Sequence, residues 1–263
     1  YINLTIILYI FRMYIVVDHY HIDREVVATA WNLCDRMISK QTAAGLNQNR
    51  LGVILVTCLL LAIKMKCRAF CEGEIAENLT RALCTLVGRN HTCTPAQICD
   101  MEKEMLKTLD WKVNAPTMQD FVRLYVDLHP LGKLGARSDT FVAQYLHEIT
   151  RYQVEQAIYK QELMMNYKPS VIAFAAMMRV EEGLEEAVLP LDMKEAETLS
   201  LHGELKLEPA EVEECLFALE NYTEKITPYE EYESEIRNIV AANNARQAGA
   251  EQALSPVGVT DGL

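Results

Sequence analysis

Signals of catalysis are missing from this sequence of 263 residues. It contains no glycine-rich phosphate loop, no G-x-S-x-G and no H-E-x-x-H, the short motifs whose residue types carry a reaction mechanism. Its eight cysteines are scattered and include no C-x-x-C pair. We therefore expect no catalytic residue, no metal site and no cofactor.

Positive charge is also scarce. The chain has 25 Lys and Arg against 37 Asp and Glu, which gives a net charge of −12 at pH 7. Binding to a phosphate backbone requires the opposite, a surface rich in Lys and Arg. We expect no direct nucleic-acid partner.

No apolar run has the length of a membrane span. The most apolar stretch, residues 1–11, ends at Arg12, and it has neither a basic leader nor a small-residue cleavage site. An uncharged run of this length is too short to cross the hydrocarbon layer comfortably. We expect a buried helix here and no membrane partner.

Helical periodicity runs through almost all of the chain. Apolar residues recur three and four apart, and no stretch shows the alternation of a β-strand. Thr94-Pro95 and Pro116-Thr117 are helix start signals. The pattern predicts an all-α protein, with helices at about 6–20, 23–40, 50–66, 72–88, 95–110, 117–129, 138–153, 155–166, 169–182, 193–201 and 209–225.

Two of these helices are apolar nearly all round, at residues 51–63 and 171–178. Such a helix belongs at the centre of a bundle, with neighbours on most sides. Each has about two helices before it and two after it, which indicates a weak structural repeat. We therefore expect one domain at residues 1–114, a second at 115–240, and a disordered tail at 241–263.

The cysteines favour structural thiols. Cys34 and Cys58 fall inside apolar helical runs, so we expect buried free thiols in a reducing compartment. A metal site could be proposed from four residues: Cys67, Cys71, His91 and Cys93. Their spacings match no zinc template, and we set that interpretation aside.

Several pieces in a fixed order carry a family resemblance. In the first half these are Asp23-Arg24-Glu25-Val26-Val27, Cys34 to Ser39, Thr57 to Lys64 and Met101 to Trp111; the second half adds Ala115-Pro116-Thr117 with Phe121, and Tyr167 to Ala173. Together, over roughly residues 9–240, they resemble the two boxes of a cell-cycle cyclin. Val17-Asp18-His19 and the turn Arg24-Glu25-Val26-Val27 resemble the expanded cyclins of diatoms and related algae. The resemblance implies the cyclin fold, with two tandem five-helix cyclin boxes.

The resemblance also implies a function. The chain would be a regulatory subunit, without a catalytic site of its own, that activates a cyclin-dependent serine/threonine kinase by holding its αC helix in the active position. It would act in cell-cycle control, in the nucleus and cytoplasm. Two alternatives stay open: a degenerate cyclin-like scaffold that does not activate a kinase, and a cyclin-fold transcription factor, which the net charge disfavours.

By motif match, Lys64 and Glu102 would clamp the kinase helix by bonding to backbone groups on either side of it. Taken alone, Lys64 could be a cation favoured by a helix C-terminus, and Glu102 a solvated helix position. Leu106 and Trp111 could equally belong to the core. The apolar floor around the clamp is expected to comprise Leu61, Met65, Leu106, Trp111 and Val113.

The first helix departs from the family pattern at two points. Asp35 is a structural residue in the family, but the position of its usual Arg partner falls at or near Ile6. Because an unpaired buried carboxylate is costly, either Asp35 has another partner, such as Arg12, or the start of this chain is not a native cyclin helix. A second departure is that Arg12 and Ile15 occupy the Trp and acidic positions of the groove that docks Arg-x-Leu motifs. We expect weak or absent docking of such motifs.

Overall fold

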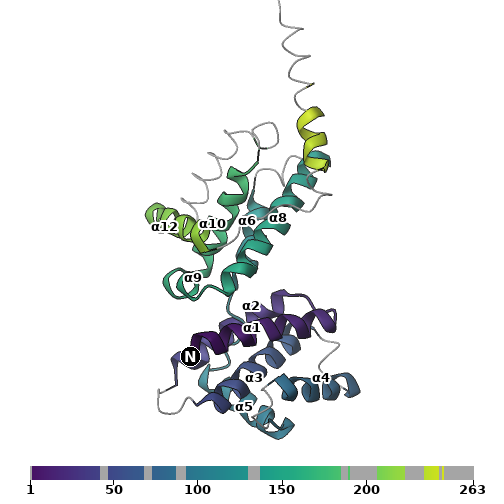
Figure 1. The fold of residues 1–263 in the computed structure, drawn as a ribbon, viewed down its shortest axis with the longest axis vertical. Helices are drawn as coiled ribbons and strands as arrows, with labels where there is room; N and C mark the ends of the chain where they lie inside the picture. Colours follow the sequence, from purple (N-terminus) through teal and green to yellow (C-terminus); the bar gives the residue numbers. More distant parts are fainter. Residues whose placement is uncertain are drawn as a thin grey trace, which may run out of the picture. The chain divides into compact units, whose positions relative to one another are not determined.

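The structure is a computed structural model that describes residues 2–41, 47–67, 73–86, 93–129, 137–184, 189, 206–222, 234–242 and 245. Every regular element within these ranges is a helix, so the all-α prediction is confirmed. The named helices (Figure 1) are α1 (Ile2–His19), α2 (Glu25–Ser39), α3 (Gln48–Lys66), α4 (Gly73–Leu86), α5 (Pro95–Thr108), α6 (Met118–Leu128), α8 (Arg137–Ile158), α9 (Gln161–Asn166), α10 (Pro169–Glu182) and α12 (Pro209–Tyr222). The helix expected at 193–201 lies outside the described residues.

The chain divides into two compact units. The first combines Tyr1–Asp120 with Glu155–Pro169, and the second combines Phe121–Val154 with Ser170–Leu263. The last residues of α8 thus belong to the first unit, although the rest of that helix belongs to the second. The domain limits expected at 114/115 and 240/241 stay predictions, and nearly all of the expected tail lies outside the described residues.

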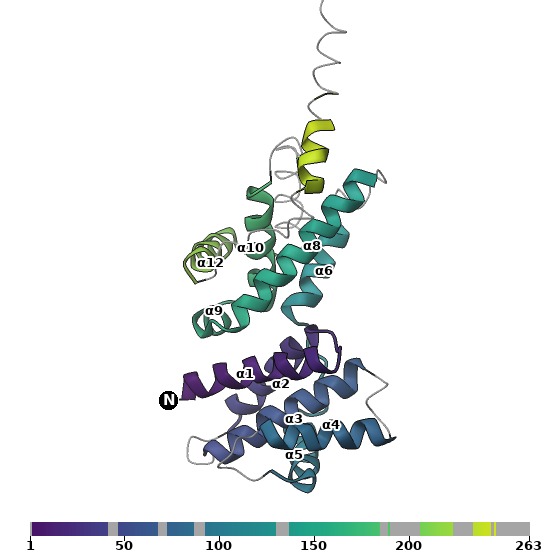
Figure 2. The same ribbon diagram turned by 45° about the vertical axis from the view of Figure 1, so that its right-hand side comes forward.

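Helix α3 is the centre of the first unit. It packs against α1, α2, α4 and α5, and it lies between the α1–α2 pair and the α4–α5 pair in both views (Figures 1 and 2). Every residue from 51 to 63 is buried, as the all-round apolar pattern predicts. The one hydroxyl in this run, on Thr57, donates to the carbonyl of Val53 at 2.7 Å, so it is buried without loss of hydrogen bonding.

Helix α10 has the same character in the second unit. Its residues 171–177 are all buried, which confirms the second all-round apolar helix except for half-buried Met178. The Phe174 ring meets the Tyr125 ring edge-on, with centroids 5.6 Å apart. The Tyr125 hydroxyl donates to the carbonyl of Ser170 at 3.1 Å, and burial raises the pKa of Tyr125 to about 12. This contact joins α6 to the start of α10.

One predicted helix break is wrong. Helix α8 continues through residue 154 to Ile158, and the chain breaks only before Gln161, where α9 begins. The sequence pattern predicted two helices here, at 138–153 and 155–166. The helix continues because Val154, Ala157 and Ile158 are all buried, so packing extends the apolar stripe past the polar residues that separate these positions.

Helix α1 is buried on one face only. Ile10, Met13 and Val17 are at most 1% exposed, whereas Phe11 and Ile15 are more than half exposed. The expectation of a buried helix therefore holds for the inner face. In the described part of the chain, no helix combines the length and apolar character needed to cross a membrane.

The described cysteines are free thiols. Cys34, Cys58 and Cys215 are buried, as expected for the first two. Burial raises the pKa of Cys58 above its usual value and that of Cys215 to about 12, so these thiols stay protonated and unreactive. Cys71 and His91 lie outside the described residues; within the described ranges no three His, Cys, Asp or Glu side chains form a group that could hold a metal.

The central position of α3 predicts an asymmetry in stability. Truncating Leu55, which is fully buried, should lower the free energy of unfolding by about 2–5 kcal/mol. Truncating Leu8, which is 50% exposed, should cost less than about 1 kcal/mol. Both tryptophans, Trp31 and Trp111, lie in the first unit, so urea unfolding followed by tryptophan fluorescence reports on it. Equal losses in Leu55→Ala and Leu8→Ala would contradict the central role of α3.

Candidate functional site

Two charged residues predicted to act together are in contact. Lys64 lies in the last turn of α3, and its Nζ is 2.8 Å from both carboxylate oxygens of Glu102 on α5. Helix α5 begins with a reciprocal capping box between Thr94 and Gln97, with Pro95 at its first position. The Lys64 and Glu102 side chains are 32% and 18% exposed. The ion pair is therefore accessible at the surface of the first unit.

Apolar residues accompany this pair on both helices. Met65 is next to Lys64 on α3, and Leu106 is one turn after Glu102 on α5; both are half-buried. Val113, in the segment after α5, is also half-buried. Leu61 differs, because it is only 6% exposed and belongs to the core. Of the five residues expected to form the floor, Leu61 therefore offers a partner the least surface.

Trp111 is presented by an unusual turn. Asp110 and Trp111 have φ angles of 52° and 60°, so two successive non-glycine residues adopt the left-handed conformation. The Trp111 N–H donates to the carbonyl of Leu106 at 2.9 Å and closes the end of α5. The Trp111 side chain is 71% exposed. Strained backbone that displays a large aromatic ring is a feature of recognition sites.

Arg36 of α2 and Lys40, the residue that follows α2, hold this turn in place. Arg36 donates to the carbonyl of Lys112 at 2.5 Å, and Lys40 donates to the carbonyl of Thr108 at 2.7 Å. Lys40 thus satisfies a free carbonyl at the C-terminus of α5 and complements the helix dipole, whereas Arg36 binds the segment that follows. We did not predict Arg36 and Lys40 as site residues. Their cationic character was visible in the sequence, but the carbonyls they bind are about seventy positions further along the chain.

Asp35 does not have the environment expected for it. It is an exposed residue of α2, and the ion pairs among the described residues do not include it. Desolvation of part of the carboxylate raises its pKa. The guanidinium of Arg12 lies 5.5 Å from the centroid of the Tyr9 ring. Asp35 therefore has no partner such as Arg12 among the described residues, and an exposed carboxylate that stays hydrated needs none.

A second charged group holds the end of α3. Lys66 Nζ is 2.8 Å from Glu25 and 3.7 Å from Asp120, and Glu25 is only 5% exposed. A buried carboxylate needs such a cation to stay charged. Because Lys66 is two residues after Lys64, this contact also fixes the turn that carries the predicted clamp. The sequence showed no sign of it, since Lys66 is far from both carboxylates along the chain.

Arg24 makes a neighbouring contact in the same unit. It donates to both carboxylate oxygens of Asp18 at 2.8 Å and lies 3.5 Å from Glu155, near the end of α8. The hydrogen bond from Arg24 lowers the pKa of Asp18. Planar, bidentate pairing of this kind is the stronger geometry of an Arg–carboxylate pair. It joins α1, α2 and α8 within the first unit.

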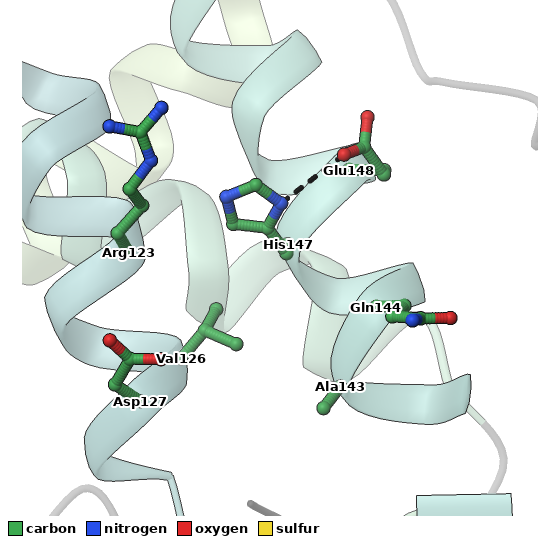
Figure 3. A pocket seen from close by; sticks show the side chains of 7 residues that line it. All are labelled: Arg123, Val126, Asp127, Ala143, Gln144, His147 and Glu148. Carbon is green, nitrogen blue, oxygen red and sulfur yellow. Dashed lines mark hydrogen bonds and ion pairs between the residues drawn. The ribbon is translucent and has the colours of Figure 1, made fainter. Parts of the chain in front are cut away.

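The second unit has a cleft of about 520 Å³ between α6 and α8 (Figure 3). Arg123 and Asp127 line it from α6, and Gln144, His147 and Glu148 line it from α8. His147 Nδ1 is 3.3 Å from Glu148, which also accepts a hydrogen bond from Arg151 at 3.0 Å. The lining includes none of the residues predicted from the sequence. One arginine with two carboxylates gives the cleft no excess of positive charge.

The described residues thus define an all-α protein of two helical units, each built around a helix that is apolar on all sides. Two family models match this chain: "Cyclin, N-terminal domain" over residues 5–114, and "Cyclin, C-terminal domain" over residues 116–244. The chain belongs to the cyclin family.

Relatives support the same assignment. Cyclin-A1-3 of Oryza sativa subsp. japonica is 25% identical over 204 residues, which are 78% of this chain and 36% of that protein. Cyclin-B2-2 of Arabidopsis thaliana is 27% identical over 160 residues, which are 61% of this chain and 32% of that protein. The chain spans about a third of the length of these relatives.

A solved structure has the same fold. It is a chain of the CAK complex of Chaetomium thermophilum bound to ATP-gamma-S, with a TM-score of 0.50 and 15% sequence identity, matched over 99% of this chain and 81% of that one. At this level of identity the similarity shows the fold alone.

The exposure of the Lys64–Glu102 pair predicts a small contribution to stability. A double-mutant cycle of Lys64→Ala and Glu102→Ala, followed by urea unfolding, should give a coupling energy of about 1 kcal/mol or less, because partly solvated pairs are screened by water. A coupling above about 3 kcal/mol would instead indicate a structural pair. A small coupling would mean that the ion pair itself is not needed for the fold, so that variants of it can test binding.

Proposed function

We propose that this chain is the regulatory subunit of a cyclin-dependent serine/threonine kinase and that it activates the kinase by holding its αC helix in the active position. The observation that carries the proposal is the accessible Lys64–Glu102 pair, in a chain that belongs to the cyclin family. We propose cell-cycle control as its role, and the nucleus and cytoplasm as its location. Catalysis would belong to the kinase.

The chemistry of the pair suits a helix clamp. The Lys64 ammonium can donate to backbone carbonyls of a partner helix, and the Glu102 carboxylate has lone pairs left to accept from backbone N–H groups. Charged hydrogen bonds of this kind are short and strong. Because these hydrogen bonds are made to backbone groups, they fix the position of the partner helix without depending on its side chains.

Trp111 would supply much of the binding energy. Tryptophan is one of the residue types enriched at energetic hot spots, and here the ring is exposed before any partner binds. The contacts of Arg36 and Lys40 hold its turn in advance, which lowers the entropy lost on binding. Met65, Leu106 and Val113 would form the half-buried surroundings, with Leu61 supporting them from the core.

Binding to one conformation is enough to explain activation. A kinase needs a lysine on its third strand paired with a glutamate of αC, and it is inactive when that helix swings out. A partner that binds only the inward position shifts the population toward it. Moving the kinase from mostly inactive to mostly active would require about 5.5 kcal/mol of differential binding.

Removing the clamp should weaken kinase binding. The double variant Lys64→Ala/Glu102→Ala, and separately Trp111→Ala, should each weaken co-purification with a cyclin-dependent kinase by at least about tenfold. Histone phosphorylation should fall with it. A matched control removes another surface ion pair, Arg81→Ala/Glu77→Ala on α4, and should change neither readout.

The outcomes of this test separate the candidate functions. Undiminished binding and activation in the clamp variants would contradict the proposed site. Kinase binding without stimulated histone phosphorylation by the native chain would show a scaffold and contradict the proposed activation. Retention of the chain on DNA at physiological salt would favour the transcription-factor alternative.

Docking of Arg-x-Leu motifs should be weak or absent. Ile15 on α1 is 52% exposed where the family has an acidic residue, and Arg12 is half-buried at the tryptophan position. A cation there disfavours a basic docking peptide. Fluorescence polarisation with a peptide that contains a single Arg-x-Leu motif should show no binding tighter than about 100 μM. Low-micromolar affinity would refute this prediction.

A further inference from the structure

One face of helix α12, in the second unit, is buried against the core. Val212, Cys215 and Leu219 recur three and four apart and are at most 1% exposed. Arg179 of α10 donates to the carbonyl of Leu219 at 3.1 Å, and α12 lies beside α10 (Figures 1 and 2). This is the packing expected of an amphipathic helix on its core.

The opposite face of α12 combines an aromatic ring with carboxylates. Phe217 is 68% exposed, and Glu213, Glu214 and Glu220 are exposed as well. Residues three and four apart on a helix are neighbours, so Glu213 and Glu214 lie on one side of Phe217 along the helix axis and Glu220 lies on the other. We call these four residues the α12 outer face.

Glu220 and Phe217 of the α12 outer face are in positions that disfavour the helix. The three carboxylates of this face take part in none of the hydrogen bonds or ion pairs among the described residues. Glu220 lies in the last turn of α12, a turn without a basic residue, where negative charge opposes the helix dipole. Phe217 exposes its apolar ring to water. A cation placed over the ring would relieve both costs.

We propose that the α12 outer face binds an arginine-containing basic segment of a partner protein. A guanidinium is planar and weakly hydrated, so it can stack on the Phe217 ring while its N–H groups donate to Glu213, Glu214 or Glu220. An anionic ligand would be repelled by the three carboxylates. An apolar partner would bury them without a counter-charge. The site is independent of the proposed kinase clamp, because it lies on a different helix in the other unit and needs no kinase.

The test uses the full chain and a labelled peptide of alternating glycine and arginine with four arginines. Fluorescence polarisation at physiological salt should show saturable binding with a Kd of about 10–300 μM. The citrulline analogue, which keeps the shape without the charge, should not bind. A lysine analogue should bind more weakly than the arginine peptide. Phe217→Ala should weaken binding about threefold to fivefold, and Phe217→Tyr should stay within about twofold of the native chain.

Two double variants with the same change in charge distinguish a specific binding site from general electrostatic attraction between the chain and the peptide. Glu213→Gln/Glu214→Gln should weaken binding at least about fivefold. Glu77→Gln/Glu162→Gln, which removes two exposed carboxylates on α4 and α9, should change it less than about twofold. Equal losses in both double variants, unchanged binding in Phe217→Ala, or no saturation up to about 1 mM peptide would each overturn the proposal.

Discussion

The burial of α3 is the constraint on which the first unit depends. A helix that is apolar on all sides can be stable in water only if other helices cover it, and α1, α2, α4 and α5 do so. This packing decides where the end of α3 emerges from the core. Lys64 and Lys66 are at that end, and everything proposed about kinase recognition starts from their position.

The two lysines at the end of α3 have different roles. Lys66 reaches buried Glu25 and holds the helix end against α2 and the start of α6. Lys64 reaches Glu102 in a pair that water still contacts. Such a pair contributes little to folding, but its hydrogen-bonding groups can be shared with a partner. Arg36 and Lys40 also prepare the surface for a partner, because they hold the turn that exposes Trp111. The isolated segment would rarely adopt this turn, since two successive residues in it have positive φ angles.

Much of this organisation was predictable from local pattern. The apolar runs at 51–63 and 171–178 predicted the central helices, because burial on all sides leaves no polar face in the sequence. Lys64 and Glu102 could be paired only through the family resemblance, since 38 residues separate them. The helix break near residue 154 was misplaced because polar residues there resembled an end, whereas Val154 and Ala157 pack into the core.

The sequence by itself determined the helical class, the repeated central helix and the membership of the cyclin family, because these are recorded in periodicity and in the order of motifs. Only the tertiary structure decided which side chains meet. It left Asp35 exposed without the expected partner, placed Leu61 in the core and Trp111 at the surface, and brought Arg36 to the carbonyl of Lys112. The physical reason is that exposure and pairing depend on neighbours distant in the chain, which periodicity does not encode.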